Sequence, residues 1–538
     1  MIPAEMPEFL SPAPDVRLVN RFDRPFDNAV ATARTCYSAN GVVTAETVGG
    51  DRFADPERRQ RAVERRDALA RDIFSAGHHT TFQHAHFQFA LSNVSRQFIW
   101  TFLHSHPHYN SEQVSQRYVE VRPDAFVVPD LSAYGPGAQQ EFQRGLDRAA
   151  AAYRALIEAL IAPAAEQYWA RFPARARKPE AWEGELARKA QEIARYALPL
   201  ATIAWLYHTV SAITLLRYHR LCESLDAPTE QRLVVRRMVD ELLQVDPAYR
   251  AVLEEPIPLD ETLEYRLFQT GAGSVGEAGR RRFRQEFDAE LGGKVSVLVD
   301  WKANNEAVLA RSVREVLGVP SGSISDDDAI ALVLDPARNP YLGETLNVAP
   351  HSKLMRAMAH PSWTFRKKLS HTADSQDQRH RATPGARPAL AAYLSEEPDY
   401  IVPGLLRESP AAMRLYSDAM DAAWESIGRL RKMGVPDEMR AYLLPNAVAI
   451  RFTESADLLG LHHKMAMRLC FNAQEEIWRA SLDEAAAVRE VNPRIGALLL
   501  PPCGIRIRAG TTPWCPEGKR YCGVPVWRYD LSQYERVI

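Results

Sequence analysis

Seven of the 15 histidines fall in one short segment between His78 and His108. Imidazole binds zinc, copper, iron and nickel, and alternate residues of a strand share a face. His84 and His86 could therefore point together, and so could His104, His106 and His108. No carboxylate stands at a supporting spacing, however, and the segment has no H-E-x-x-H motif. The other interpretation is that these histidines hydrogen-bond to a ligand or to the backbone, so a metal enzyme stays one of the open hypotheses.

A run of amide, hydroxyl and guanidinium side chains follows the histidines, at Gln113, Ser115, Arg117 and Tyr118. A mononucleotide brings about two negative charges, and arginine forks and backbone N–H groups are the groups that bind phosphate. The residue types therefore fit a nucleotide site. A single arginine is more often part of a weak surface ion pair, so this interpretation depends on several arginines recurring at matched places.

The segment from Gly77 to Tyr118 resembles the flavin-dependent thymidylate synthases. That family's signature begins with Gly-His-x-Ser and Glu-His, continues with a strand ending in Val-Ser-Arg, and then has Arg-His-Arg. It closes with Ser-x-(Asn/Ser)-(Glu/Gln)-x-Ser-x-Arg-Tyr. The residues that match in order are Gly77, His78, His84, Val94, Ser95, Arg96, Gln113, Ser115, Arg117 and Tyr118. Gln83 replaces the glutamate, and His104-Ser105-His106 replaces the Arg-His-Arg triplet that binds flavin and nucleotide in the family.

The second half of the chain has a complementary pattern. Arg366-Lys367-Lys368 is placed where the basic triplet would be, and this half keeps permanent positive charge that histidine does not supply. Ser375 to His380 resembles the end of the motif, with Asp377 where serine is expected and His380 where tyrosine is expected. Neither half keeps the full set, so any working site is predicted to be composite.

Two later motifs extend the resemblance. Glu192 to Pro199 matches the family's Glu-x-x-Arg-x-x-Leu-Pro helix, whose arginine, here Arg195, contacts the nucleotide; the second copy is Glu438 to Pro445. Arg468 to Ile477 is close to Arg-x-x-x-x-Ala-Gln-x-Glu-Ile, whose arginine supports the uracil ring, and Arg220 is its counterpart in the first half. A cation there would stabilise the electron density that an activated uracil ring gains.

The resemblance implies methylation of dUMP to dTMP with FAD, and with NADPH and methylenetetrahydrofolate as co-substrates. The predicted catalytic residues are Ser115, Arg220 and Arg468. The predicted nucleotide-binding residues are Gln113, Ser115, Arg117, Arg195, Arg220 and Arg468. The predicted cofactor-binding residues are His78, His104, His106, Arg366, Lys367, Lys368 and His463. The alternative is a diverged nucleotide- or flavin-binding homologue with a structural or regulatory role.

Cysteines near the end of the chain form a separate signal. Cys503, Cys515 and Cys522 lie in a Pro- and Gly-rich segment, and Cys470 is a candidate fourth member. Four thiolates would make a closed structural zinc site. The spacings are not C-x2-C, and buried or loop thiols are the favoured interpretation, so no metal is predicted and zinc is a weak alternative.

The composition is that of an ordinary globular protein. The chain has 538 residues, 46% hydrophobic and 25% charged, with a formal net charge of −2. Such a balance excludes a bulk nucleic-acid coat or a membrane-surface protein. Six cysteines are too few for a disulfide scaffold, and the first twenty residues lack a basic segment followed by an apolar one. We therefore expect a cytoplasmic protein, with a pyrimidine mononucleotide as partner and no nucleic acid or membrane.

Landmarks in the same order indicate a tandem duplication. Alternating apolar residues and then a 3.6-residue period predict a strand and a helix in both 15–38 and 294–317. Trp-Thr-Phe, Gln-Arg, Leu-Pro and Arg-Leu-Cys follow in each half. We expect an α/β (α+β) protein of two tandem units, 1–271 and 294–538, each a mixed sheet with helices, joined by a linker at 272–293. The second unit includes a Cys-containing tail, 501–538. A homodimer would reproduce the family's four-unit assembly.

Other segments have their own signals. Amphipathic helices are predicted over 56–76, 139–171 and 410–433, and loops over 318–328 and 380–388. Residues 197–216 contain no Asp, Glu, Lys or Arg and approach the length of a membrane span. Pro199, His208 and Ser211 within them favour a fully buried helix.

Overall fold

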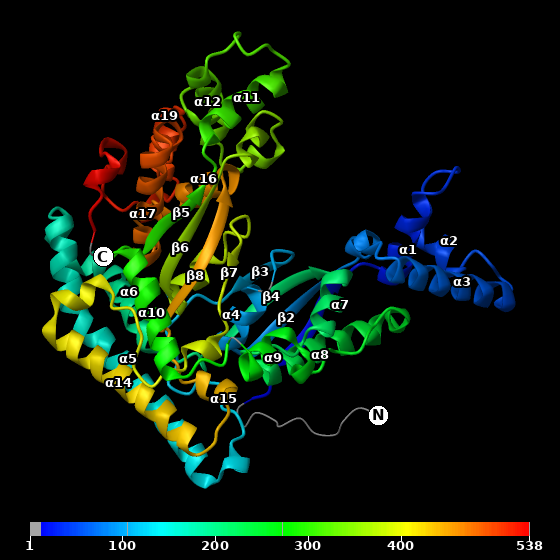
Figure 1. Ribbon diagram of the computed structural model, residues 1–538, viewed down its shortest axis with the longest axis horizontal. Coiled ribbons are helices and arrows are strands. Elements are labelled where there is room, and N and C mark those ends of the chain that lie inside the picture. Colours follow the sequence, from blue (N-terminus) through cyan, green and yellow to red (C-terminus); the bar gives the residue numbers. More distant parts are fainter. Residues whose placement is uncertain (1–11, 105, 272, 537) are drawn as a thin grey trace. The chain divides into compact units, whose positions relative to one another are not determined.

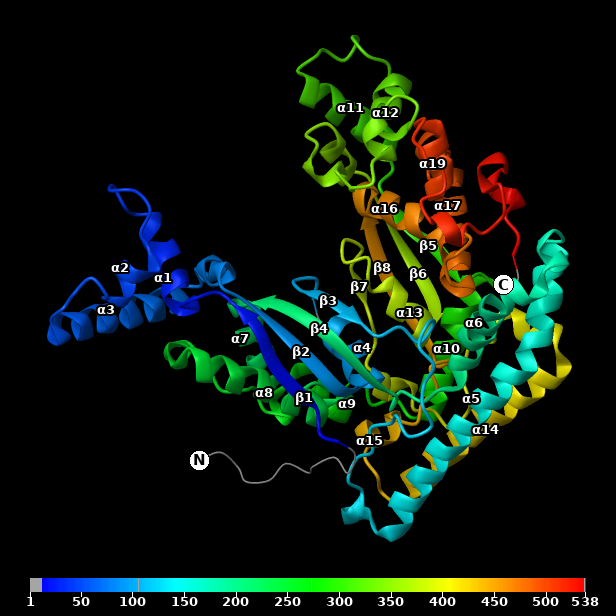
Figure 2. The same cartoon turned by 180° about the vertical axis from the view of Figure 1, so that it is seen from behind.

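The protein contains two antiparallel sheets with the same strand order, seen in the computed structural model, which describes residues 12–104, 106–271, 273–536 and 538 (Figures 1 and 2). In the first, β1-β2-β4-β3, the strands are β1 (Asp15–Arg21), β2 (His86–Ser95), β4 (Ile203–Ser211) and β3 (Asn110–Gln113). In the second, β5-β6-β8-β7, they are β5 (Ser296–Trp301), β6 (Ser362–Ser370), β8 (Ala449–Asp457) and β7 (Gly385–Ala386). The prediction of two similar α/β units is confirmed.

The registers show which residues are equivalent. His208 on β4 pairs with Phe89 on β2, and Glu454 on β8 pairs with Phe365 on β6. His208 and Glu454 also face the edge strand of their own sheet, β3 or β7. The two residues therefore occupy the same position in the two sheets.

Helices surround both sheets. α8 lies along β1, and α17 lies along β5 (Figure 2). The helices of the first half and its boundary are α1 (Pro25–Thr35), α2 (Ala45–Gly49), α3 (Pro56–Ser75), α4 (Arg96–His104), α5 (Pro136–Arg171), α6 (Glu183–Ala194), α7 (Ala212–Arg220), α8 (Pro228–Val245), α9 (Leu263–Thr270) and α10 (Glu277–Leu291). Those of the second half are α11 (Asn305–Leu317), α12 (Asp326–Leu334), α13 (His371–Asp377), α14 (Pro410–Lys432), α15 (Asp437–Ala441), α16 (Leu458–Arg468), α17 (Glu475–Val491), α18 (Pro493–Gly496) and α19 (Pro502–Arg508).

Most of the predicted elements are confirmed. The strand–helix pairs are β1–α1 and β5–α11, and the three predicted amphipathic helices are α3, α5 and α14. The predicted loops are shorter than expected, because α12 begins at Asp326 and β7 lies within 380–388. α10 occupies most of 272–293.

The prediction of a buried helix over 197–216 is wrong. Its middle part is strand β4, Ile203–Ser211, which lies between two neighbours in the first sheet, and α7 begins only at Ala212. A central strand covered on its core face is apolar without needing a helical period, and Thr and Val favour strands. Among the residues that the structure describes, no helix is long and apolar enough to cross a membrane.

The two compact units of the chain do not coincide with its sequence halves. Unit 1 comprises residues 1–147, 199–275 and 426–443, and unit 2 comprises 148–198, 276–425 and 444–538. Unit 1 thus includes α15, from the second half, and unit 2 includes α6, from the first half. Each of these two short helices belongs to a copy of the Leu-Pro motif.

A buried glutamate fixes each exchanged segment. In unit 1, Glu230 accepts hydrogen bonds from the Ser95 amide (2.7 Å) and hydroxyl (2.6 Å) and from the Tyr442 hydroxyl (2.6 Å). All three side chains are buried, so the bonds offset much of the cost of desolvating the carboxylate. Unit 2 repeats the arrangement with Glu476, Ser370 and Tyr196.

Candidate functional site

An Arg-His-Arg triplet, Arg379-His380-Arg381, lies directly after α13. α13 begins at the residue after the last residue of β6, as α4 begins at the residue after the last residue of β2. Counting from these strand ends places Arg379 to Arg381 at the position of His104 to His106. Ser105 lies outside the described residues. These three residues were not among the predicted cofactor-binding residues, although their residue types match the Arg-His-Arg motif.

Arg468 holds the central histidine of this triplet. Its Nε donates to His380 Nε2 (2.8 Å), and its Nη2 donates to the Gln376 carbonyl (2.8 Å). Burial, followed by the charges of Arg468 and Lys464, keeps the pKa of His380 well below its usual value. His380 is therefore neutral at pH 7, and because Nε2 accepts a hydrogen bond, the ring proton is on Nδ1.

A chain of hydrogen bonds positions α13 against α17. Gln376 Nε2 donates to Gln474 Oε1 (2.8 Å), and Gln474 in turn donates to the Tyr196 hydroxyl. Tyr196 donates to Glu476 (2.5 Å), whose pKa burial raises to about 7. Most of the side chains in this hydrogen-bond network are buried, so the network fixes the start of the triplet relative to the second sheet.

The basic segment predicted from sequence has a different place. Arg366, Lys367 and Lys368 lie on strand β6, whereas His104 and His106 in the first half lie at and after the end of α4, the helix that follows β2. Arg366 forms an ion pair with Glu290, and Lys368 with Asp288 (2.7 Å). Strand alternation points Lys367 to the opposite face, where it is fully buried. These three residues therefore do not occupy the position of His104 to His106, and their role in cofactor binding stays a prediction.

Lys367 belongs to a buried ion cluster, which also contains Lys464, Arg387, Asp374, Asp377, Glu454 and Glu484. Lys367 Nζ lies 2.6 Å from Glu454 and 2.7 Å from Glu484, and Lys464 Nζ lies 2.8 Å from Asp377. Burial, with the charge of Asp377, raises the pKa of Glu454 to about 7. Asp377 lies at the end of α13, and its equivalence to the motif's serine stays a prediction.

The predicted nucleotide-binding run of the first half lies at the edge of the first sheet. Gln113 is the last residue of β3, and its Oε1 accepts from Arg96 Nη1 (2.5 Å). Ser115 Oγ accepts from the Arg117 amide (3.3 Å), and the Arg117 guanidinium lies 5.6 Å from the Tyr118 ring centre. The structure thus brings these residues together in one turn after β3.

Two of the predicted histidines of unit 1, His104 and His106, lie beside aromatic side chains. His104 ends α4 and bonds the Trp100 carbonyl through Nδ1 (2.7 Å). His106 Nε2 bonds the Tyr218 hydroxyl (2.7 Å), and burial lowers its pKa to about 4. His208 bonds the same hydroxyl (3.2 Å). His106, neutral at pH 7, does not supply the permanent charge of an arginine.

The remaining predicted residues are divided between the units. Arg220 is exposed and pairs with Glu254 (3.4 Å). Arg195 is buried in unit 2, where its Nε donates to the Glu192 carbonyl (3.1 Å). His78 is exposed in unit 1, and His463 contacts Asn347 in unit 2 through Nδ1 (3.3 Å). The composite site stays a prediction.

The four candidate zinc cysteines do line one cavity, of about 10 Å³, in unit 2. All four are free thiols, and burial and the neighbouring thiols raise the pKa of Cys470 and of Cys503 to about 12. In the described part of the chain, however, no group of three or more His, Cys, Asp or Glu side chains is arranged to hold a metal ion. Neither the cysteines nor the histidines between 78 and 108 therefore gain support as a metal site.

One protein family matches more than half of the chain. The family described as thymidylate synthase complementing protein matches residues 17–248 and 307–494. The flavin-dependent thymidylate synthase of Geobacter sulfurreducens is 28% identical over 177 residues, 31% of this chain and 70% of that protein. That of Clostridium tetani is 25% identical over 234 residues, 43% and 83% of the two chains. A crystal structure of a UMP/dUMP methylase from Streptomyces cacaoi with 5-Br dUMP covers 45% of this chain and 96% of its own, at a TM-score of 0.30 and 21% identity.

Proposed function

Because the chain belongs to the family of thymidylate synthase complementing proteins, we propose that it is a flavin-dependent enzyme that methylates dUMP to dTMP. Methylenetetrahydrofolate would supply the carbon, and NADPH would supply the reducing equivalents. The observation that supports this proposal best is the Arg379-His380-Arg381 triplet, which has the residue types of the family's Arg-His-Arg motif and follows α13 in unit 2.

The residues of this triplet fit a flavin or a nucleotide phosphate. Arg379 and Arg381 are exposed, and among the residues that the structure describes Arg379 has no ion-pair partner. An exposed guanidinium next to a preorganised histidine can bind an anion without first breaking an internal ion pair. A bound flavin supplies the hydride chemistry of such a reaction.

The protein's own contribution is position and charge. Arg379 and Arg381 would bind the anionic part of the ligand. His380, neutral and held by Arg468, would donate its Nδ1 proton as a hydrogen bond in a fixed direction. In unit 1, Ser115 and Arg117 are the residues that the family resemblance assigns to the nucleotide, and Arg117 would provide a bidentate fork for its phosphate.

Flavin binding tests this proposal most directly. The absorbance spectrum of the purified protein and a titration with FAD should show binding, and dTMP should form from dUMP when both co-substrates are present. Arg379→Ala should weaken FAD binding about tenfold or more, the loss typical of a charge-assisted hydrogen bond. Arg366→Ala is the matched control, because Arg366, on β6, already forms an ion pair with Glu290 of α10.

The outcomes separate the two proposed classes of function. Equal losses in Arg366→Ala and Arg379→Ala would reject the triplet as the flavin site. Binding of FAD and dUMP without formation of dTMP would favour a diverged homologue with a regulatory or structural role. The replacement of arginines by histidines in unit 1 is the observation that keeps this second candidate in view.

A further inference from the structure

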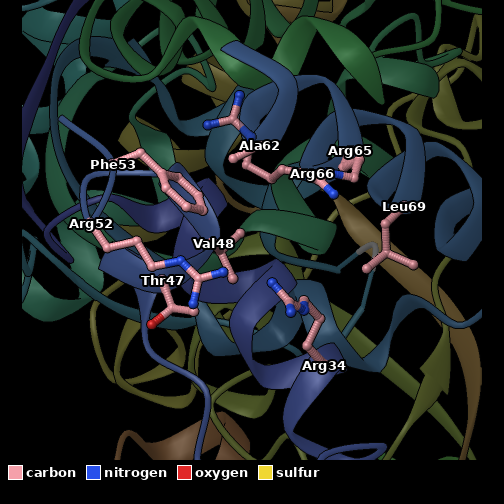
Figure 3. Close-up of a pocket in the computed structure, with 9 residues that line it drawn as sticks. All are labelled: Arg34, Thr47, Val48, Arg52, Phe53, Ala62, Arg65, Arg66 and Leu69. Carbon is pink, nitrogen blue, oxygen red and sulfur yellow. The ribbon is translucent and has the colours of Figure 1, made fainter. Parts of the chain in front are cut away.

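A basic pocket lies among the three helices that precede the first sheet's second strand, away from every residue used above. It has a volume of about 300 Å³ and is lined from α1, α2, α3 and the α2–α3 loop (Figure 3). The lining residues are Arg34, Thr47, Val48, Arg52, Phe53, Ala62, Arg65, Arg66 and Leu69. The volume is at the lower end of the range typical of small-molecule sites.

The four arginines of this pocket differ in whether a carboxylate pairs with them. Arg66 is neutralised by Asp27 (2.7 Å) and Asp67 (2.6 Å). Arg34, Arg52 and Arg65, in contrast, have no carboxylate partner among the described residues. Other arginines on α3 do form ordinary helix pairs, such as Arg58 with Asp55 (3.7 Å). Convergence of unpaired guanidinium groups on one hollow is unfavourable by itself, and a bound polyanion would relieve the repulsion.

The pocket also has an apolar and aromatic side. The Arg52 guanidinium lies 4.7 Å from the centre of the Phe53 ring, and that ring is half-buried. Val48 is buried, Leu69 is half-buried, and the Thr47 hydroxyl adds one neutral hydrogen-bonding group. A ligand that fits this lining has a flat ring for Phe53 and several negative charges for the arginines.

Backbone geometry builds this pocket. Gly50 ends α2 with a φ of 81°, in the left-handed region that glycine adopts without strain. A Cβ at Gly50 would lie 2.9 Å from Ala62 Cβ and 3.2 Å from the Arg59 carbonyl of α3. The close approach turns the chain so that Arg52 and Phe53 face the same hollow as Arg65.

We propose that this pocket binds a nucleotide that carries two or more phosphates. Arg34, Arg52 and Arg65 hold the phosphates, and Phe53 contacts the base. The site is additional to the proposed flavin and mononucleotide site, because it uses none of the same residues. It would let a second nucleotide bind to unit 1.

Calorimetric titration of the full-length protein tests the proposal, with ADP, adenosine and inorganic pyrophosphate as probes. ADP should bind at least tenfold more tightly than adenosine, and its affinity should fall with added salt. Arg34→Gln, Arg52→Gln and Arg65→Gln should each weaken ADP binding about tenfold. Arg58→Gln, on the same helix but outside the pocket, should leave the affinity unchanged. All four are exposed side chains, so their substitution should not prevent folding.

Two further variants separate this site from its alternatives. Phe53→Leu should weaken binding of ADP but not of pyrophosphate. FAD also contains an ADP group, so ADP could instead occupy the proposed flavin site. Arg379→Ala tests this alternative and should leave the ADP affinity unchanged. Loss of ADP binding in Arg379→Ala alone would place the nucleotide in the proposed flavin site and overturn the inference. Absence of ADP binding at millimolar concentration and low salt, equal losses in Arg58→Gln, or no effect of Phe53→Leu on ADP would also overturn it.

Discussion

The two sheets carry opposite chemistry at one equivalent position. In unit 1, His208 lies among aromatic side chains: its ring centre is 4.8 Å from Phe102 and 5.8 Å from Tyr218. In unit 2, the equivalent Glu454 lies among ions and pairs with Lys367 and Lys464. Both clusters are buried behind strands of the same order and register.

The difference shows how one topology tolerates two kinds of core. Phe102 is the seventh residue of α4, which follows β2, and Asp377 is the seventh residue of α13, which follows β6. Likewise, Tyr218 is the seventh residue of α7, after β4, and Lys464 is the seventh residue of α16, after β8. Apolar and aromatic contacts need only matching volume. Buried charges must also be paired and solvated by neighbours, so unit 2 depends more on each individual residue.

Lys367→Met should have the largest effect on stability. Lys367 faces three carboxylates, and its removal leaves Lys464 and Arg387 to compensate four acidic groups. Breaking a buried ion pair by removing one partner costs about 3–5 kcal/mol. Chemical denaturation should therefore show a drop of this size in the free energy of unfolding.

Lys302→Met is the control for Lys367→Met, because Lys302 is exposed and its ammonium group donates to the His360 carbonyl (2.7 Å). Surface changes of this kind usually fall within about 0.5 kcal/mol. Equal stability of the two variants would mean that the ion cluster does not hold unit 2 together.

Tyr196→Phe and Tyr442→Phe should have similar, smaller effects. Each hydroxyl donates to a buried glutamate that also binds a serine at a strand end. Loss of such a bond leaves the carboxylate with one donor fewer and costs about 1–3 kcal/mol. Tyr196→Phe should be the more severe, because its hydroxyl also accepts from Gln474. Thermal unfolding of the two variants measures both losses of stability. A loss in only one variant would show that the tyrosine–glutamate hydrogen bond does not stabilise both units.

The sequence predicted the elements better than it predicted their equivalence. Amphipathic periods placed α3, α5 and α14, because those patterns depend only on local residues. The Trp-Thr-Phe landmark was misleading, since Trp100 lies in α4 whereas Trp363 lies in β6. That shift moved the expected basic triplet from Arg379 onto β6. The ion cluster could not be predicted, because its members come from five elements and the loop after β7, which only the fold brings together.

Glu476→Gln and Glu230→Gln should change the pH dependence of stability. Burial raises the pKa of Glu476 from an ordinary 4.5 to about 7 and also raises that of Glu230. Between pH 4.5 and 7 the folded protein therefore binds a proton at Glu476 that the unfolded chain does not, so stability falls as the pH rises. Each variant should flatten this fall, by up to about 1.4 kcal/mol per pH unit for Glu476.

Denaturation curves from pH 5 to 8 measure that slope. Glu490→Gln is the matched control, since Glu490 is exposed on the same helix, α17. A slope in Glu476→Gln that equals the wild-type slope would contradict the buried, protonated state of this residue.

His208→Leu should have the smallest effect at neutral pH and so completes the comparison with unit 2. Burial, followed by the charge of His106, lowers the pKa of His208 to about 3, so the ring is neutral at pH 7. Its loss leaves the Tyr218 hydroxyl bonded to His106 (2.7 Å), and the change should stay within about 1 kcal/mol. Below pH 6.5 the unfolded chain binds a proton at this histidine and the folded protein does not, so wild-type stability falls as the pH falls. His208→Leu removes that loss and should gain on the wild type by up to about 1.4 kcal/mol for each pH unit between 6.5 and 3. A variant that is severely destabilised at pH 7 would show that the aromatic cluster depends on its histidine as unit 2 depends on its lysines.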